Sequence, residues 1–128
     1  MRSRIRQHYQ DTYITTRSVG TLYLADFSER TQKTRGVEVH NTIPSCPDNP
    51  DREMDCVRLY NPTCIGIEFN IFDDHQFKDE HGNDLRHCEC CIFPSENHNK
   101  SWVVMLEIKD CKPKNISDYK DDVVQQII

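Results

Sequence analysis

The sequence is poor in glycine and contains no long apolar run. Only four glycines occur in 128 residues, at positions 20, 36, 66 and 82, so the chain lacks the glycine-rich loop that cradles nucleotide phosphates. The longest apolar run is the five residues from Trp102 to Leu106, whereas a membrane-spanning helix needs about 20 residues. We therefore expect neither a nucleotide-binding fold of that kind nor an integral membrane protein.

The sequence also lacks a secretory signal and the cysteine pattern of a disulfide framework. The basic N-terminus is not followed by the apolar stretch that a signal peptide requires. The chain has seven cysteines, an odd number, which favours reduced thiols in a reducing compartment. We therefore predict a cytoplasmic protein.

Zinc is the alternative explanation for the cysteines. Cys88, Cys90 and Cys91 lie close together, with His87 beside them. Structural zinc sites usually present two closely spaced ligand pairs, whereas the cysteines at positions 46, 56 and 64 are far apart in sequence. The spacing favours small, half-buried residues on strands over a zinc site.

Charge is distributed unevenly along the chain, whose net charge is −5. Residues 1–36 contain seven Lys or Arg against three Asp or Glu, whereas residues 37–128 contain nine against eighteen. A basic arm of this kind can neutralise nucleic-acid phosphates, or it can be an ordinary solvated surface. The residues that we expect to contact phosphates are Arg2, Arg4, Arg6 and Arg17.

Hydropathy patterns predict an α+β fold in a single domain spanning residues 1–128. Residues 1–62 are expected to form the basic arm, a short helix or strand at 21–31, of which we favour the helix, and a loop over 41–62. Four prolines in that loop exclude regular helix and central strand. Alternating or apolar segments at 65–71, 86–93 and 101–109 predict a three-stranded antiparallel meander. A helix capped by Asn115 or Ser117 is expected to follow.

An acidic pair and a lysine are expected to meet at one end of this sheet. Glu107 and Lys109 fall on the same face of the third strand, since side chains alternate along a strand. Antiparallel pairing would bring Glu89, near the start of the second strand, close to Glu107. Two carboxylates suit Mg²⁺ or Mn²⁺, and the lysine could act on a metal-bound water. An exposed edge pair of Glu107 and Lys109 is the simpler alternative.

This arrangement resembles the PD-(D/E)XK nuclease superfamily, with its restriction-endonuclease-like core, over about residues 63–128. The resemblance rests on the triplet Glu107-Ile108-Lys109, the preceding acidic hairpin strand and the following helix that bears glutamine. It implies that Glu89 and Glu107 hold the metal, that Lys109 is catalytic, and that Gln125 or Gln126 matches the family glutamine. The sequence lacks the family's usual aspartate at position 89, for which Asp84 or Asp74 are alternatives.

The resulting functional prediction is a bacterial, Mg²⁺- or Mn²⁺-dependent nuclease-like hydrolase that cleaves phosphodiester bonds, with DNA a better candidate substrate than RNA. The alternative is an inactive relative or a non-catalytic protein-interaction module. In that alternative the sheet leaves an edge that another chain covers, and a homodimer is one form of such an assembly.

Overall fold

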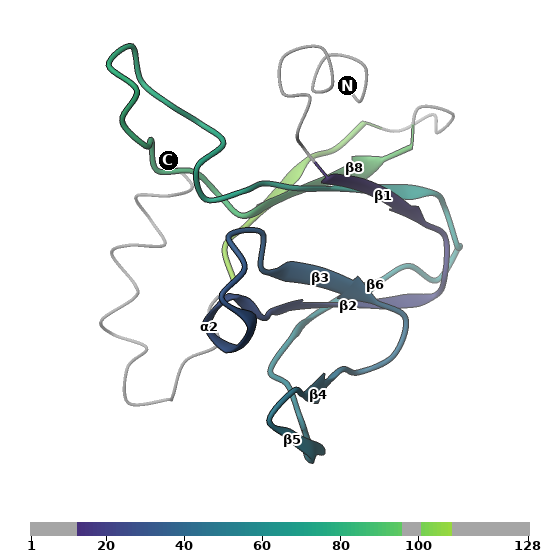
Figure 1. Ribbon diagram of the computed structural model, residues 1–128. Coiled ribbons are helices and arrows are strands. Elements are labelled where there is room, and N and C mark those ends of the chain that lie inside the picture. The colour runs from purple at the N-terminus through teal and green to yellow at the C-terminus, as the bar shows by residue number, and fades with distance from the viewer. Residues whose placement is uncertain (1–12, 96–100, 109–128) are drawn as a thin grey trace.

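A computed structural model describes residues 13–95 and 101–108, which form two main antiparallel β-sheets stacked face to face (Figure 1). A short two-stranded hairpin projects from one of them. The elements are β1 (Tyr13–Arg17), β2 (Thr21–Asp26), α2 (Ser28–Thr31), β3 (Val37–His40), β4 (Ser45–Cys46), β5 (Asn49–Glu53), β6 (Val57–Tyr60), β7 (Ile67–Ile71), β8 (Cys90–Pro94) and β9 (Val104–Leu106).

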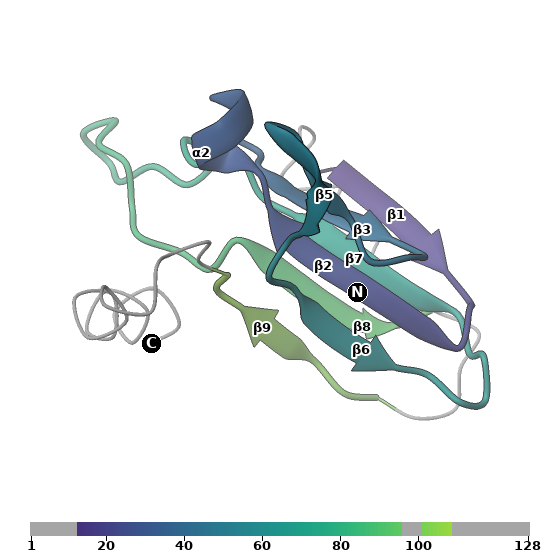
Figure 2. The same cartoon turned by 90° about the horizontal axis from the view of Figure 1, so that it is seen from below.

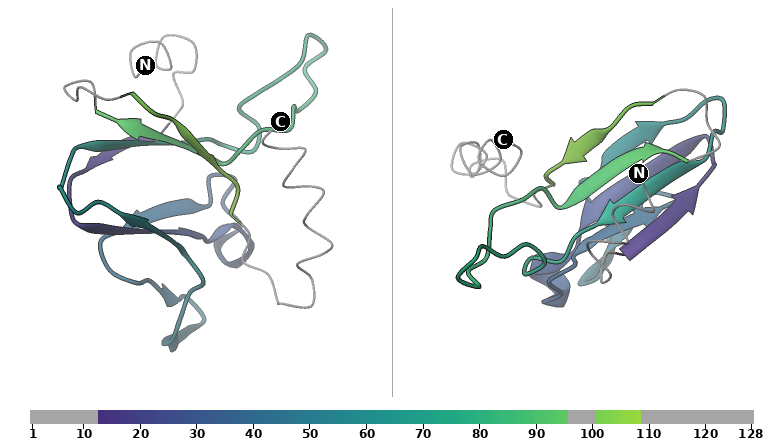
Figure 3. Two further views of the ribbon diagram at one scale, coloured as in Figure 1. Left: turned by 180° about the vertical axis from the view of Figure 1, so that it is seen from behind. Right: turned by 90° about the horizontal axis from the view of Figure 1, so that it is seen from above.

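The larger sheet has the strand order β1-β7-β8-β9, and all of its pairs are antiparallel. It contains the predicted meander, since β7, β8 and β9 are neighbours in chain order. The connection between β7 and β8 is long and projects beyond the sandwich (Figure 3). At its tip, Asp79 accepts hydrogen bonds from the backbone N–H groups of His81 and Asn83, and Gly82 adopts a left-handed φ of 82°. Asp79 and Gly82 therefore form a turn of the kind that these residue types favour.

The smaller sheet has the order β3-β2-β6, again antiparallel. The chain crosses between the sheets twice, once from β1 to β2 and once from β6 to β7. The two crossings are joined where the Asn61 backbone N–H donates to the Gly20 carbonyl (2.7 Å). The buried Asn61 side chain also closes its own turn through both the N–H and the carbonyl of Ile65. This amide therefore fixes one end of the sandwich.

The main core lies between the two sheets. Alternate residues of each strand point inward, so that one face of each sheet is apolar. The buried cluster is drawn from both layers and includes Leu22, Leu24, Val37, Ile67, Phe69, Ile71, Cys90, Ile92 and Ile108. A second, smaller cluster of Ala25, Phe27, Cys46 and Met54 attaches the β4–β5 hairpin to the end of β2.

The structure corrects the predicted α+β class, because the described residues are almost entirely β-structure. Residues 21–26, for which a helix was favoured, form β2, since Leu22 and Leu24 both enter the core on one face of a strand. The helical turn α2 occupies only Ser28–Thr31. The expectation of an N-terminal helical or irregular segment is therefore wrong. The predicted C-terminal helix lies outside the described residues.

A second correction concerns β7, which the alternation predicted to be half-buried. Glu68 and Asn70 are 2% and 0% exposed, so both faces of this strand are buried. β7 is flanked by β1 and β8 and is therefore interior to its sheet. In the part of the chain that is described, no helix is long and apolar enough to cross a membrane.

Gly36 is predicted to be the glycine least tolerant of substitution. A Cβ atom added there would lie 2.5 Å from the Ser28 Cβ and 2.7 Å from its backbone nitrogen. At Gly20 the nearest atom would be the Asn61 carbonyl oxygen at 4.0 Å. We expect Gly36→Ala to lower the free energy of unfolding by about 1–3 kcal/mol, and Gly20→Ala to change it by no more than about 0.5 kcal/mol. Equal midpoints for both variants in urea denaturation would contradict this packing.

Candidate functional site

The predicted acidic pair lies where β8 begins and β9 ends. The register of these strands places Glu89 beside Glu107, as expected from antiparallel pairing. The Glu89 backbone N–H donates to the Leu106 carbonyl (3.1 Å), and its carboxylate accepts the Ile108 N–H (3.2 Å). Burial raises the pKa of the Cys88 thiol, and the nearby Glu107 and Glu89 carboxylates raise it further. Glu89 thus helps to hold the end of β9.

Most of the other predicted site residues lie outside the part of the chain that the structure describes. Lys109 and Gln125 lie outside the described residues, and so do Arg2, Arg4 and Arg6. Within the described ranges, no group of three or more His, Cys, Asp or Glu side chains is arranged to hold a metal ion. The Mg²⁺ or Mn²⁺ site therefore stays a prediction.

The alternative acidic ligands lie near Glu89. Asp74, Asp84 and Glu89 line one hollow of about 360 Å³ beside the β7–β8 connection. Asp84 contacts the Lys78 ammonium group, and one of its oxygens lies 2.8 Å from the His75 Nδ1 atom. Hydrogen bonding from Lys78, followed by that from His75, lowers the pKa of Asp84. This carboxylate is therefore engaged within its own loop.

Three of the described cysteines, Cys46, Cys88 and Cys90, are buried packing residues. The six described cysteines are free, and Cys90 lies in the main core. Burial raises the pKa of Cys90 strongly and that of Cys91 to about 11. Electrophiles require the thiolate, which burial of Cys90 and Cys91 disfavours at neutral pH. The geometry therefore supports the structural interpretation of the Cys88 to Cys91 cluster.

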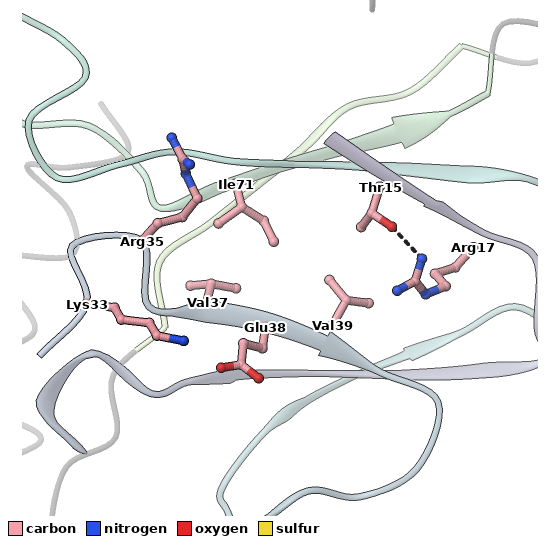
Figure 4. Close-up of a pocket in the computed structure, with 8 residues that line it drawn as sticks. All are labelled: Thr15, Arg17, Lys33, Arg35, Val37, Glu38, Val39 and Ile71. Atoms are coloured by element: carbon pink, nitrogen blue, oxygen red, sulfur yellow. Dashed lines mark hydrogen bonds between the residues drawn. The ribbon is translucent and has the colours of Figure 1, made fainter. Parts of the chain in front are cut away.

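A basic cleft opens on the side of the sandwich formed by β1 and β3, the edge strands of the two main sheets (Figure 2). Its volume is about 350 Å³. β1 provides Thr15 and Arg17, and the segment leading into β3 provides Lys33 and Arg35. Ile71, at the end of β7, lies at its base with the valines of β3 (Figure 4). Residues distant in sequence therefore meet here because two sheet edges face each other.

Arg17 lies on the inward face of β1. Its register partner is Ile67, whose side chain belongs to the main core, so the two side chains share a face of the sheet. The guanidinium donates to the Thr15 hydroxyl and to the Thr16 carbonyl (3.1 Å). This inward position would normally suit an apolar side chain. A cation there is held at the mouth of the cleft and keeps further donors for a ligand.

The charge balance of the cleft is positive. Arg17, Lys33 and Arg35 line it together with Glu38. Glu38 alternates with the inward-facing valines of β3, and its carboxylate lies on the opposite face, 3.2 Å from the His40 Nε2 atom. Figure 4 shows that carboxylate directed away from the cleft. Glu38 lies toward the Lys33 end of the cleft, so it leaves Arg17 at the other end without an acidic neighbour among the lining residues.

Arg35 also interacts with the Asp73 carboxylate at the edge of the cleft. The Asp73 carboxylate accepts a hydrogen bond from the Thr34 hydroxyl (2.5 Å). This bond lowers the pKa of Asp73 most, the His75 backbone N–H lowers it as well, and the Arg35 charge adds a smaller effect. Arg35 is thus shared between the cleft and the loop that follows β7. Lys33 is exposed on the same rim.

Sequence reasoning found Arg17 but missed Thr15, Lys33 and Arg35. The excess of basic residues in 1–36 was the available signal, and it was interpreted as a basic arm that either contacts phosphates or forms a solvated surface. It could not show that residues before and after α2 reach the same cleft, because that proximity depends on the pairing of β1 with β7 and of β3 with β2.

Comparison with known proteins identified no relative of this chain. The chain has no significant match among protein-family models, curated proteins or solved structures.

We predict that the exposed Cys64 reacts much faster with a thiol reagent than the cysteines of β8 do. With Ellman's reagent at pH 8, Cys64→Ser should remove one equivalent from the fast phase. Cys90 and Cys91 should react at least roughly 100-fold more slowly in the folded protein, because their raised pKa values leave little thiolate. Loss of an equally fast phase in Cys91→Ser would contradict the burial of this strand.

Proposed function

We propose that this chain is a binding module that holds an anionic group of its ligand in the basic cleft between β1 and β3. The half-buried Arg17 carries this proposal, because its side chain shares the core-facing side of the edge strand β1 with Thr15 and lines the cleft, at a position where an apolar side chain would be usual. Lys33 and Arg35 add positive charge to the same cleft. The free cysteines suit the reducing conditions of the cytoplasm, which we retain as the proposed location.

The predicted nuclease activity has less support than binding. It relied on a restriction-endonuclease-like sheet followed by a helix, and the described residues form a β-sandwich instead. Glu89 and Glu107 are adjacent, but Glu89 is engaged with the backbone of Ile108. The binding proposal needs no contribution from Lys109 or from a metal ion.

A compact anion fits the cleft better than a nucleic acid does. The chain has a net charge of −5, so a long phosphate backbone would be repelled over much of the surface. Two carboxylates flank the cleft directly, that of Asp73 beside Arg35 and that of Glu38 on the outer face of β3. Favourable charge is therefore confined to a volume of about 350 Å³, which matches the lower range of small-ligand sites.

Pyrophosphate is a suitable first probe for isothermal titration calorimetry at low ionic strength. We expect Arg17→Gln to weaken its binding about 10-fold or more, because a charge-assisted hydrogen bond contributes about 1.5–3 kcal/mol. The matched control is Arg52→Gln, which removes the same charge from an exposed position on β5. Circular dichroism would verify that both variants fold.

Either of two results would overturn the anion-binding proposal. One is the absence of pyrophosphate binding to the wild-type protein at millimolar concentration. The other is an equal loss of affinity in Arg17→Gln and Arg52→Gln, which would indicate general electrostatic attraction. A single-stranded DNA oligonucleotide serves as the comparison, and tighter, Arg52-dependent binding of DNA would favour the nucleic-acid alternative.

Strand β9 supports a second candidate function, self-association through a sheet edge. β9 is the outermost strand of the larger sheet, and Val103, Val104 and Met105 are 42%, 39% and 52% exposed. Residues 101–106 contain no charged side chain, although lysine or proline commonly protects such edges. Two copies could therefore pair antiparallel along β9 without bringing like charges together.

Met105→Lys is predicted to shift such an assembly toward monomer. The control is Tyr60→Lys, which places the same charge on β6, the edge of the other sheet, where Tyr60 is 76% exposed. Sedimentation equilibrium should show at least a roughly 10-fold weaker dimer for Met105→Lys only, since a like-charge pair at the two-fold axis costs of the order of 1 kcal/mol or more. A monomeric wild-type protein at about 100 μM would exclude this candidate.

A further inference from the structure

The cleft has a polarity pattern along its length as well as a net charge. Arg17 lies at one end, whereas Lys33 and Arg35 lie toward the other (Figure 4). Between them the walls are apolar, formed by Val37 and Ile71. Both are deeply buried, at 4% and 1% exposed, so they form the floor of the cleft. Val39 continues this strip toward Arg17.

We propose that the ligand is an elongated organic dianion, with an anionic group at each end and an apolar segment between them. This inference rests on the proposed anion-binding function and specifies the class of ligand. One end would pair with Arg17, and the other would lie near Lys33. The apolar segment would cover the strip formed by Val37, Val39 and Ile71.

The alternatives fit this pattern less well. A compact inorganic anion can satisfy only one charged end of the cleft and makes no use of the apolar strip between the ends. An amphiphile with one charged group would place its apolar tail against the cations at the other end of the cleft. Those cations would then lose contact with water without gaining an anionic partner. A polyphosphate would bring charge onto the valine and isoleucine side chains. Only a ligand with two separated charges matches both the ends and the middle.

The length of β3 limits the length of such a ligand. Strand β3, from Val37 to His40, spans about 10 Å at about 3.3 Å per residue. The long side chains of Arg17 and Lys33 can shorten the distance between their charged groups. We therefore expect the best fit for straight-chain α,ω-dicarboxylates of about six to ten carbons.

The test is a calorimetric series of α,ω-dicarboxylates from four to twelve carbons, with monocarboxylates of the same carbon number at constant ionic strength. Affinity should rise by up to about fourfold for each added methylene as the apolar strip is covered, and then fall once the chain exceeds the cleft. At the optimal length, the dicarboxylate should bind at least about 10-fold more tightly than its monocarboxylate partner.

Two variants test which side chains bind the charged groups of the ligand, and a third tests the contact with its apolar segment. Arg17→Gln and Lys33→Gln should each remove the preference for the dicarboxylate over the monocarboxylate, whereas Arg52→Gln should preserve it. Val39→Thr keeps the side-chain shape and adds a hydroxyl group, so it should flatten the dependence on chain length while pyrophosphate binding is unchanged. Thermal unfolding of each variant would verify that its fold is intact.

The outcomes separate this inference from the proposed function. If pyrophosphate binding depends on Arg17 but dicarboxylates bind no better than monocarboxylates, the cleft is an anion site and the dianion inference is wrong. Affinity that does not depend on chain length would also overturn it. If neither pyrophosphate nor any dicarboxylate binds, both the inference and the proposed function are wrong.

Discussion

Burial of two apolar sheet faces against each other is the interaction on which the rest of this structure depends. Leu22 and Leu24 of β2 pack in the same cluster as Phe69 and Ile71 of β7, although more than forty residues separate them in sequence. The backbone bond between Asn61 and Gly20 holds the two crossings of the chain together at one end. The positions of the sheet edges follow from this packing, and the edges contain both candidate sites.

The two open sides of the sandwich differ in chemistry. On one side, β1 and β3 face each other with cations at the mouth and valines below (Figure 4). On the other side, β9 is an apolar edge without charge. A cation on the inward face of β1 opposes the packing that stabilises the fold, so Arg17 represents a cost in stability that binding can offset. This conflict between local chemistry and fold points to a site on the first side.

The sequence predicted local features well where hydropathy alternation was strong. Ile67, Phe69 and Ile71 identified β7, and the meander of β7 with β8 and β9 was confirmed. The loop predicted over 41–62 was wrong, because β4, β5 and β6 form there. The exclusion of a central strand agrees with the structure, since β4 and β5 form a separate hairpin and β6 is an edge strand. The burial of the second face of β7 could not be predicted, because the burial of Glu68 and Asn70 depends on contacts distant in sequence.

The N-terminal third of the chain shows why the rest was missed. Leu22 and Leu24 alternate over too few residues to separate a strand from a short helix. Once β2 was misassigned, the second sheet could not be inferred, and the basic residues around it were interpreted as an arm. The cleft exists only when β1 lies in one sheet and β3 in the other. Composition alone contains no information about that arrangement.

The most direct test of this account is the location at which an anion binds. Backbone amide shifts of the ¹⁵N-labelled protein should be followed by NMR during a pyrophosphate titration. The account predicts that the largest changes cluster at residues 15–17 and 33–39, on the two strands that face each other across the cleft. Changes centred on the hollow beside Asp74 and Glu89, or spread evenly over the basic residues, would contradict it.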